Sequence, residues 1–153
     1  IRPTSLRNQI VNDAFEIFID KRHLIKLYDG VEDSLKILSK KYELGVLTNG
    51  NADIYKFEIG RYFKFSISSL EAKDNKPNRS HFDEASKQLE GIKFDEMLHI
   101  GDHQINDIIG ANNLGINTLW FNNNNNEWEQ DSKKPDEFSS WKRLPEIIDK
   151  YYG

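Results

Sequence analysis

The sequence predicts an α/β fold in which a Rossmann-like parallel sheet is flanked by helices. Short apolar segments alternate along the chain with segments of helical spacing. The apolar segments are four or five residues long, which suits buried strands better than helices. Turn-forming or polar residues follow these segments directly, for example at residues 48–50 and 101–102. Strands buried between helices in a parallel sheet show this pattern.

An amphipathic helix is expected near the start of the chain. Its apolar residues recur at spacings of three and four and form one stripe: Leu6, Ile10, Val11, Ala14, Phe15, Phe18 and Ile19. We interpret this stripe as a surface that packs into a core, rather than as a cofactor or partner groove. Asp29-Gly30 ends the segment.

Helices and strands then alternate to the end of the chain. The expected helices cover residues 31–41, 52–60, 79–89, 107–115 and 141–152. The expected strands cover residues 43–47, 63–67, 97–100 and 118–121. Residues 68–75 and the asparagine run at 122–126 are expected to be solvated loops.

Composition excludes several classes of protein. The 153 residues fit one domain, and the net charge of −4 offers no basic surface for nucleic acid or for anionic lipid. The chain has no cysteine, so a disulfide scaffold and a thiolate metal site are excluded, and a cytoplasmic location is expected. No apolar run approaches the roughly 20 residues that span a bilayer. We therefore expect a small-molecule partner, with no nucleic acid and no membrane.

Polar residues lie where strands are expected to end, which is where ligands bind in open parallel sheets. Thr48-Asn49-Gly50 follows the strand at 43–47 and precedes the helix expected at 52–60. A hydroxyl and the free backbone N–H groups of a helix start can hold a phosphate. Asn-Gly is also a common turn dipeptide, so a plain turn is the alternative.

Lys76-Pro77 is a second candidate, ahead of the helix expected at 79–89. A lysine at this place can neutralise phosphate charge, and Pro77 suits the first helical turn. The alternative is a solvated turn.

Gly101-Asp102 and Asp107 form the third candidate. Asp102 follows the strand at 97–100, and Asp107 is expected to begin the next helix. Two carboxylates so placed can face one pocket, where Mg²⁺ would take one as a ligand and the other as a supporting group. The alternative is that Asp107 only caps its helix while Asp102 lies in a turn.

The order of these motifs resembles the haloacid dehalogenase superfamily of hydrolases. The residues that match its second, third and fourth motifs are Thr48, Lys76-Pro77, and Gly101-Asp102 with Asp107. Residues 47–52, 60–63 and 99–102 are similar to a branch that carries a helical cap and contains flavin mononucleotide and nucleotide phosphatases. The resemblance covers nearly the whole chain. Lys73 and His103 depart from residues common in the family, which weakens the substrate assignment more than the fold.

The resemblance implies a Mg²⁺-dependent phosphatase that acts on a small phosphorylated metabolite, with flavin mononucleotide or a nucleotide as candidates. It implies phosphate binding by Thr48, Asn49, Gly50 and Lys76. Thr48 and Lys76 would be catalytic, and the metal residues would be Asp102 and Asp107. His99 and His103 are left out of the metal site because Mg²⁺ prefers oxygen; we expect His99 to pack or to bond a backbone group, and His103 to line the pocket.

The first motif of the superfamily, D-x-D-x-T/V, has no match, because no D-x-D occurs in these 153 residues. In the family its first aspartate attacks phosphorus and forms an aspartyl-phosphate that water hydrolyses. That segment precedes the cap, so residues 1–27 are expected to be the C-terminal part of the cap and residues 28–153 the α/β core. We interpret the chain as a fragment and expect it to be inactive alone.

The family's sheet order, 5-4-1-2-3, also implies a gap. The strand of the first motif lies between the strands that here end at Thr48 and Gly101. Without it, those two strands would either leave a slot or close up and pair directly. In both cases we expect the chain to be poorly stable alone. A slot would expose apolar strand edges, and direct pairing of the two strands would collapse the phosphate pocket.

Two other functions remain open. A signalling receiver domain also places Thr and Lys-Pro at strand ends around Mg²⁺, but its acidic residues precede the Thr, whereas here they follow Lys76. A non-catalytic homologue that binds or scaffolds would lack the nucleophile altogether. The sequence does not identify the substrate or the oligomeric state.

Overall fold

The computed structural model describes residues 9–13 and 26–153. Of the expected cap segment, residues 1–27, residues 9–13 and 26–27 are described, and the rest lies outside the described residues. Residues 9–13 are helical, as expected. Ile10 and Val11 are each 59% exposed, so the core packing predicted for these two residues is wrong within the described chain.

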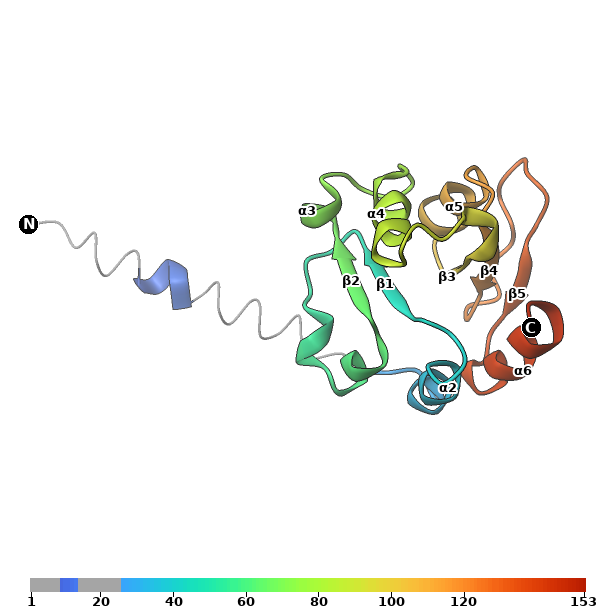
Figure 1. The fold of residues 1–153 in the computed structure, drawn as a ribbon, viewed down its shortest axis with the longest axis horizontal. Helices are drawn as coiled ribbons and strands as arrows, with labels where there is room; N and C mark the ends of the chain where they lie inside the picture. Colours follow the sequence, from blue (N-terminus) through green and yellow to red (C-terminus); the bar gives the residue numbers. More distant parts are fainter. Residues whose placement is uncertain (1–8, 14–25) are drawn as a thin grey trace, which may run out of the picture.

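The described strands form two parallel sheets that lie side by side (Figure 1). The strands of the first sheet are β1 (Gly45–Thr48) and β2 (Phe65–Ser68). Those of the second are β3 (Leu98–Gly101), β4 (Asn117–Phe121) and β5 (Asp136–Phe138), in that order. Every pairing is parallel, which confirms the predicted α/β class.

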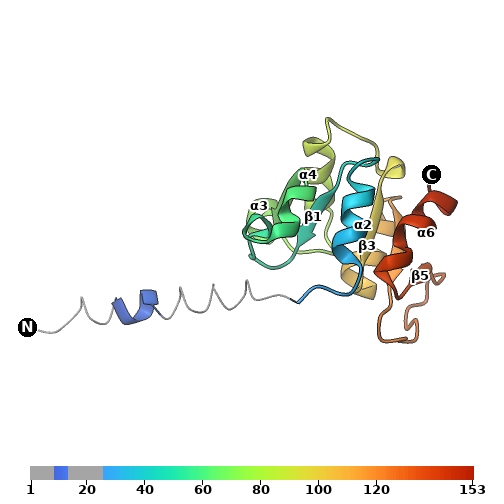
Figure 2. The same ribbon diagram turned by 90° about the horizontal axis from the view of Figure 1, so that it is seen from below.

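Helices lie on two sides of these sheets. The helices are α2 (Val31–Leu38), α3 (Ser69–Ala72), α4 (Ser80–Gln88), α5 (Gly110–Asn112) and α6 (Leu144–Tyr151). α2 and α6 pack against each other on one side, as Figures 1 and 2 both show, while α4 contacts β1 and β2. Leu38 of α2 and Ile148 of α6 share a core cluster with Leu119 of β4, so both helices pack on the second sheet. No helix in the described residues is long and apolar enough to cross a membrane.

Several elements differ from the prediction. The segment expected as one helix at 52–60 is two 3₁₀ turns, Ile54–Lys56 and Glu58–Tyr62. Phe57 between them is extended and packs against the cluster of Val31, Leu35 and Ile59, which divides the segment.

The loop expected at 68–75 contains α3 instead. Ser68 and Glu71 form a capping box: the Ser68 hydroxyl accepts from the Glu71 N–H, and the Glu71 carboxylate accepts from the Ser68 N–H. This reciprocal capping stabilises a helix too short to show hydrophobic periodicity.

The other differences lie toward the end of the chain. A π-helix, Gln104–Ile109, replaces the start of the helix expected at Asp107. The last helix begins with a 3₁₀ turn, Trp141–Arg143, and a further one covers Phe94–Glu96. The strand β5 was not predicted.

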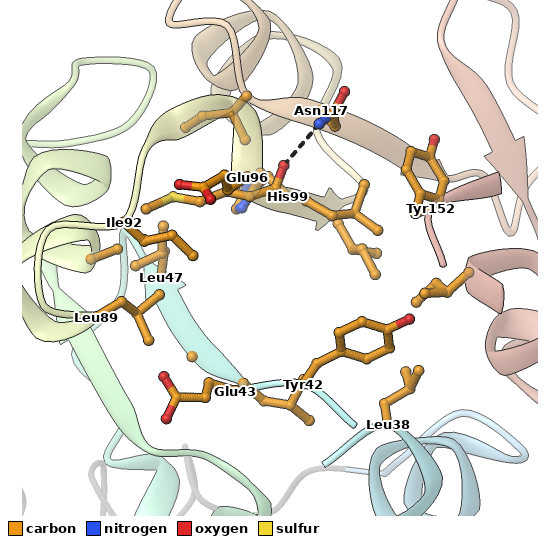
Figure 3. A pocket seen from close by; sticks show the side chains of 18 of the residues that line it. Leu38, Tyr42, Glu43, Leu47, Leu89, Ile92, Glu96, His99, Asn117 and Tyr152 are labelled. Carbon is orange, nitrogen blue, oxygen red and sulfur yellow. Dashed lines mark hydrogen bonds between the residues drawn. The ribbon is translucent and has the colours of Figure 1, made fainter. Parts of the chain in front are cut away.

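A cleft of about 740 Å³ lies between β1 and β3 (Figure 3). Within the described chain these two strands belong to different sheets and are not hydrogen-bonded to each other. The side chains around the cleft are largely apolar and include Leu47, Phe82, Met97, Leu98 and Ile100. The expected slot is therefore present, and the alternative of direct pairing is wrong.

Candidate active site

Lys76 and Asp107 form a buried ion pair at the carboxyl ends of the strands. Lys76 Nζ lies 2.6 Å from Asp107 Oδ1, and the two side chains are only 8% and 9% exposed. Lys76 Nζ also donates a hydrogen bond of 2.8 Å to the carbonyl oxygen of Leu47 in β1. One ammonium group therefore links the end of β1 to the helix that follows β3.

The Asp107 carboxylate is held from several directions. Its Oδ2 accepts from the His103 N–H at 3.0 Å, and its Oδ1 lies 3.4 Å from His99 Nε2. Burial by itself raises the pKa of Asp107, but the hydrogen bond from His99 and the charge and hydrogen bond of Lys76 outweigh it. The pKa of Asp107 therefore lies well below its ordinary value. At neutral pH this group is a buried carboxylate.

Gly101 makes room for that carboxylate. A Cβ atom at Gly101 would lie 2.4 Å from both Cβ and Cγ of Asp107, far inside van der Waals contact. The glycine before Asp102 is thus required by the close approach of the Asp107 side chain to β3.

Asn49 connects the second and third motifs. Its Oδ1 accepts from the Lys76 N–H at 2.7 Å, and its Nδ2 donates to the Lys76 carbonyl at 2.9 Å. This two-way pairing holds the segment after β1 against the backbone of Lys76. The order of motifs in the sequence did not predict this contact.

Thr48 lies at the end of β1, as expected, but its surroundings differ from the prediction. Its Oγ1 accepts from the Gly50 N–H at 2.9 Å, so that N–H is engaged within a turn. No helix begins at residue 52, since the first 3₁₀ turn starts at Ile54. The expected anion site at a helix start is therefore absent here, and the turn alternative describes the local backbone.

Pro77 also differs from the prediction, because it lies outside α4. The helix begins at Ser80 with Arg79 as its N-cap residue. The chain from Lys76 to Asn78 forms a turn, and this turn brings Lys76 beside the end of β1.

Asp102 is exposed at the end of β3. Its carbonyl oxygen accepts from Trp120 Nε1 at 2.9 Å, and its carboxylate has no hydrogen bond or ion pair with the rest of the described chain. Asp107 lies inside the π-helix rather than at its start, and His103 is the N-cap residue. The alternative in which Asp107 only caps a helix is therefore wrong.

These two carboxylates differ in what each could offer to a magnesium ion. Mg²⁺ usually keeps several waters and takes one or two carboxylates. The Asp102 carboxylate is available for direct contact, whereas both Asp107 oxygens already accept hydrogen bonds. No group of three His, Cys, Asp or Glu side chains in residues 9–13 and 26–153 is arranged to hold a metal. If Mg²⁺ binds here, Asp102 would be its ligand and Asp107 a supporting group, and further ligands would have to come from water and substrate.

Three histidines have roles that the sequence analysis missed. His99 packs edge-on against Phe82, as expected, and its Nε2 also contacts the Asp107 carboxylate, which was not expected. Its spacing of two from Gly101 places both residues on one face of β3, and this spacing was the available signal. His103 Nδ1 accepts from the N–H groups of Ile105 and Asn106, so it caps the π-helix. His81 bonds the Thr48 carbonyl.

The fold is a Rossmann-like α/β fold, with a cluster of buried polar contacts among Lys76, Asp107 and Asn49 at the carboxyl ends of its strands. The chain belongs to the haloacid dehalogenase-like hydrolase family, whose model matches residues 3–121. This match decides against the receiver-domain alternative, and it confirms the resemblance drawn from the motifs.

Individual relatives agree with this placement. The chain is 32% identical over 113 residues to 5-amino-6-(5-phospho-D-ribitylamino)uracil phosphatase YigB of Escherichia coli, covering 74% of this chain and 47% of that protein. It is 28% identical over 127 residues to pyrimidine 5'-nucleotidase PynA of Streptococcus pneumoniae, covering 79% and 54%. The chain thus spans about half the length of these curated relatives.

A solved structure supports the fold over nearly all of the chain. A 2-haloacid dehalogenase from Pseudomonas syringae pv. Tomato DC3000 superposes with a TM-score of 0.90 at 30% identity, covering 98% of this chain and 65% of that one. A HAD phosphatase from Thermococcus onnurineus has the same fold, with a TM-score of 0.76 at 23% identity over 88% of this chain and 64% of that one.

Proposed function

We propose that the full-length protein, meaning this chain together with a segment that carries the first motif, is a Mg²⁺-dependent phosphomonoester hydrolase. The observation that carries the proposal is the buried contact of Lys76 with Asp107 and with the Leu47 carbonyl. This contact brings the second, third and fourth motifs together in the described chain. Phosphoryl transfer depends on such preorganised charge.

Each motif residue has a role in this proposal. The Thr48 hydroxyl and the Asn49 backbone N–H bind phosphoryl oxygens, whereas the Gly50 N–H donates to Thr48 Oγ1 and is left out of the proposal. Lys76 offsets negative charge on the phosphate and the nucleophile. Asp102 binds Mg²⁺, and Asp107 orients Lys76 and supports the metal's waters. When bound, Mg²⁺ neutralises charge on the phosphate.

The cleft between β1 and β3 supports a specific place for the nucleophile. An extended segment in the cleft can hydrogen-bond to both strand edges and cover their apolar side chains. If that segment is the strand of the first motif, its carboxyl end reaches the site beside Thr48 and Lys76. Its first aspartate would attack phosphorus and break the bond to the ester oxygen, forming the aspartyl-phosphate, while the second aspartate of the motif would protonate the departing alkoxide. Water would then hydrolyse the aspartyl-phosphate to inorganic phosphate and restore the aspartate.

For the substrate we propose a phosphorylated ribityl compound such as flavin mononucleotide, with nucleoside monophosphates next. The names of YigB, a ribitylamino-pyrimidine phosphatase, and PynA, a pyrimidine nucleotidase, support this class. Other relatives are glyceraldehyde 3-phosphate phosphatases, such as that of Pyrococcus abyssi, 35% identical over 85 residues. A panel of phosphomonoesters tests the proposal, and a preference for two- or three-carbon phosphates such as phosphoglycolate would contradict it.

The activity itself is tested with p-nitrophenyl phosphate and Mg²⁺. We expect the full-length protein to hydrolyse it, and Asp102→Asn to weaken the metal dependence and lower turnover by about 10²-fold or more. Asp131→Asn, at another exposed aspartate, is the matched control and should leave turnover unchanged. Unchanged activity in Asp102→Asn would remove Asp102 from the metal site, and no hydrolysis by the full-length protein would favour a non-catalytic homologue.

A further inference from the structure

His81 is a buried histidine that none of the motifs includes. It lies in the first turn of α4 and has no exposed surface. Its Nε2 is 3.1 Å from the carbonyl oxygen of Thr48. Because a carbonyl oxygen only accepts, Nε2 must carry the proton and donate it to this hydrogen bond. The tautomer of the ring is therefore set by Thr48.

The other ring nitrogen supports a neutral imidazole. His81 Nδ1 is buried and has no hydrogen-bond partner among the described residues. A second proton there would be a buried donor without an acceptor, which is costly. Burial lowers the pKa of His81, and the charges of Lys76 and His99 lower it further; the hydrogen bond to Thr48 and the charge of Asp74 oppose this only in part. At neutral pH the ring is a neutral donor.

The hydrogen bond acts on the peptide group that joins Thr48 to Asn49. The carbonyl of Thr48 and the N–H of Asn49 belong to one planar trans peptide and point in opposite directions. Holding the carbonyl toward His81 thus turns the Asn49 N–H away from α4. The Asn49 side chain is fixed independently by its two hydrogen bonds to the Lys76 backbone. The peptide and the side chain of Asn49 are anchored by different partners.

We infer that His81 is a positioning residue of the phosphate site, because its Nε2–H group sets the Thr48–Asn49 peptide plane and hence the direction of the Asn49 N–H. This inference rests on the proposed function, in which that N–H binds a phosphoryl oxygen. A backbone donor that is aimed before substrate arrives needs no reorganisation during the reaction.

Two variants of His81 distinguish a role in orienting the Thr48–Asn49 peptide from a role in filling the buried space. His81→Phe keeps a ring in the buried space but removes the donor, whereas His81→Gln provides an amide N–H that can reach the same carbonyl. In the full-length protein with p-nitrophenyl phosphate, His81→Phe should lower kcat about tenfold, the equivalent of one net hydrogen bond. His81→Gln should recover most of that loss. If both variants keep the wild-type kcat, or if both lose it equally, the inference is wrong.

A measurement on the wild-type protein tests the geometry without using activity. In ¹⁵N-histidine-labelled full-length protein at neutral pH, His81 should show a protonated Nε2 and an unprotonated Nδ1. A ring protonated at Nδ1, or at both nitrogens, overturns the inference. Absence of phosphatase activity in a protein with the expected tautomer would instead contradict the proposed function and, with it, the role in phosphate binding, while leaving the hydrogen bond in place.

Discussion

The carboxyl ends of β1 and β3 make different contacts from the rest of these strands. At their carboxyl ends the two strands are joined by buried polar contacts, above all the bonds of Lys76 to the Leu47 carbonyl and to Asp107. Along their length the same strands face an apolar cleft of about 740 Å³ without pairing. The polar site is thus assembled without any segment between the strands, while the core beneath it is open.

Because of this difference, the placement of the motif residues and the stability of the sheet depend on two different regions of the molecule. The contacts among Lys76, Asp107 and Asn49 place the second, third and fourth motifs. The stability of the sheet depends on apolar burial, and the residues of β1 and β3 are at most partly buried. Substitutions in the two regions should therefore have different effects.

The largest effect is expected from breaking the polar region. In the full-length protein, Lys76→Met removes the partner of a buried carboxylate. We expect it to lower kcat by about 10²-fold or more and the free energy of unfolding by about 3–5 kcal/mol. Enzyme kinetics and urea denaturation measure the two changes.

Lys41→Met is the matched control for this experiment. Lys41 pairs with Asp149 at 2.7 Å, but both side chains are about half exposed, so its loss should leave the free energy of unfolding nearly unchanged. Equal destabilisation by the two substitutions would show that the buried pair has no special part in the fold.

A smaller effect is expected in the apolar region, where it should depend on the length of the chain. Leu119 of β4 has no exposed surface, so Leu119→Ala should cost about 2–5 kcal/mol in urea denaturation of any chain that contains it. Ile100 of β3 lines the cleft and is only partly buried. Ile100→Ala should therefore cost less in the 153-residue chain, and more once the full-length protein covers the cleft. The same cost for Ile100→Ala in both chains would contradict a cleft that another segment fills.

Strands and motifs could be predicted because their signals are local. The four predicted strands and the places of Thr48, Lys76 and Asp102 at or after strand ends depend on short apolar runs and the turns that follow them. β5 carries no such signal: its Asp136 and Glu137 are exposed and only Phe138 is buried. Its pairing is set by β4, which lies beside it.

The burial of Asn122 was also not predictable from local sequence. The asparagine run was expected to be solvated, and residues 123–126 are exposed. Asn122 is instead buried, and its side chain bonds Asn126 and Glu137. Within a run of identical asparagines the sequence does not indicate which side chain is buried. Burial of Asn122 depends on its contact with Glu137 of the neighbouring strand β5.

The details of the site were not predictable for a related reason. The contacts of Asn49 with Lys76 and of His81 with Thr48 join residues 27 and 33 positions apart. They depend on how α4 packs on β1, which the motif spacing does not specify.

The smallest effect is expected from acid, and it concerns the Asp107 carboxylate. Its pKa in the folded state is below the value in the unfolded chain, about 3.9. The stabilisation is therefore fully present above that value and is lost as the pH falls through the folded-state pKa. In metal-free buffer, urea denaturation of the full-length protein should show stability falling below about pH 4.

Asp107→Asn should be less stable at neutral pH and should lose less on acidification. Asp149→Asn, at the exposed pair with Lys41, should keep most of the wild-type pH dependence. If Asp107→Asn retains the full wild-type slope, the acid sensitivity comes from other carboxylates.

We propose that these 153 residues supply the phosphate- and metal-binding side chains, and that another segment supplies the nucleophile. The most direct test compares the purified 153-residue chain with the full-length protein in one assay, with p-nitrophenyl phosphate and Mg²⁺. We expect hydrolysis by the full-length protein and none by the 153-residue chain, which contains no D-x-D sequence. Mg²⁺-dependent hydrolysis by the pure 153-residue chain would contradict the account.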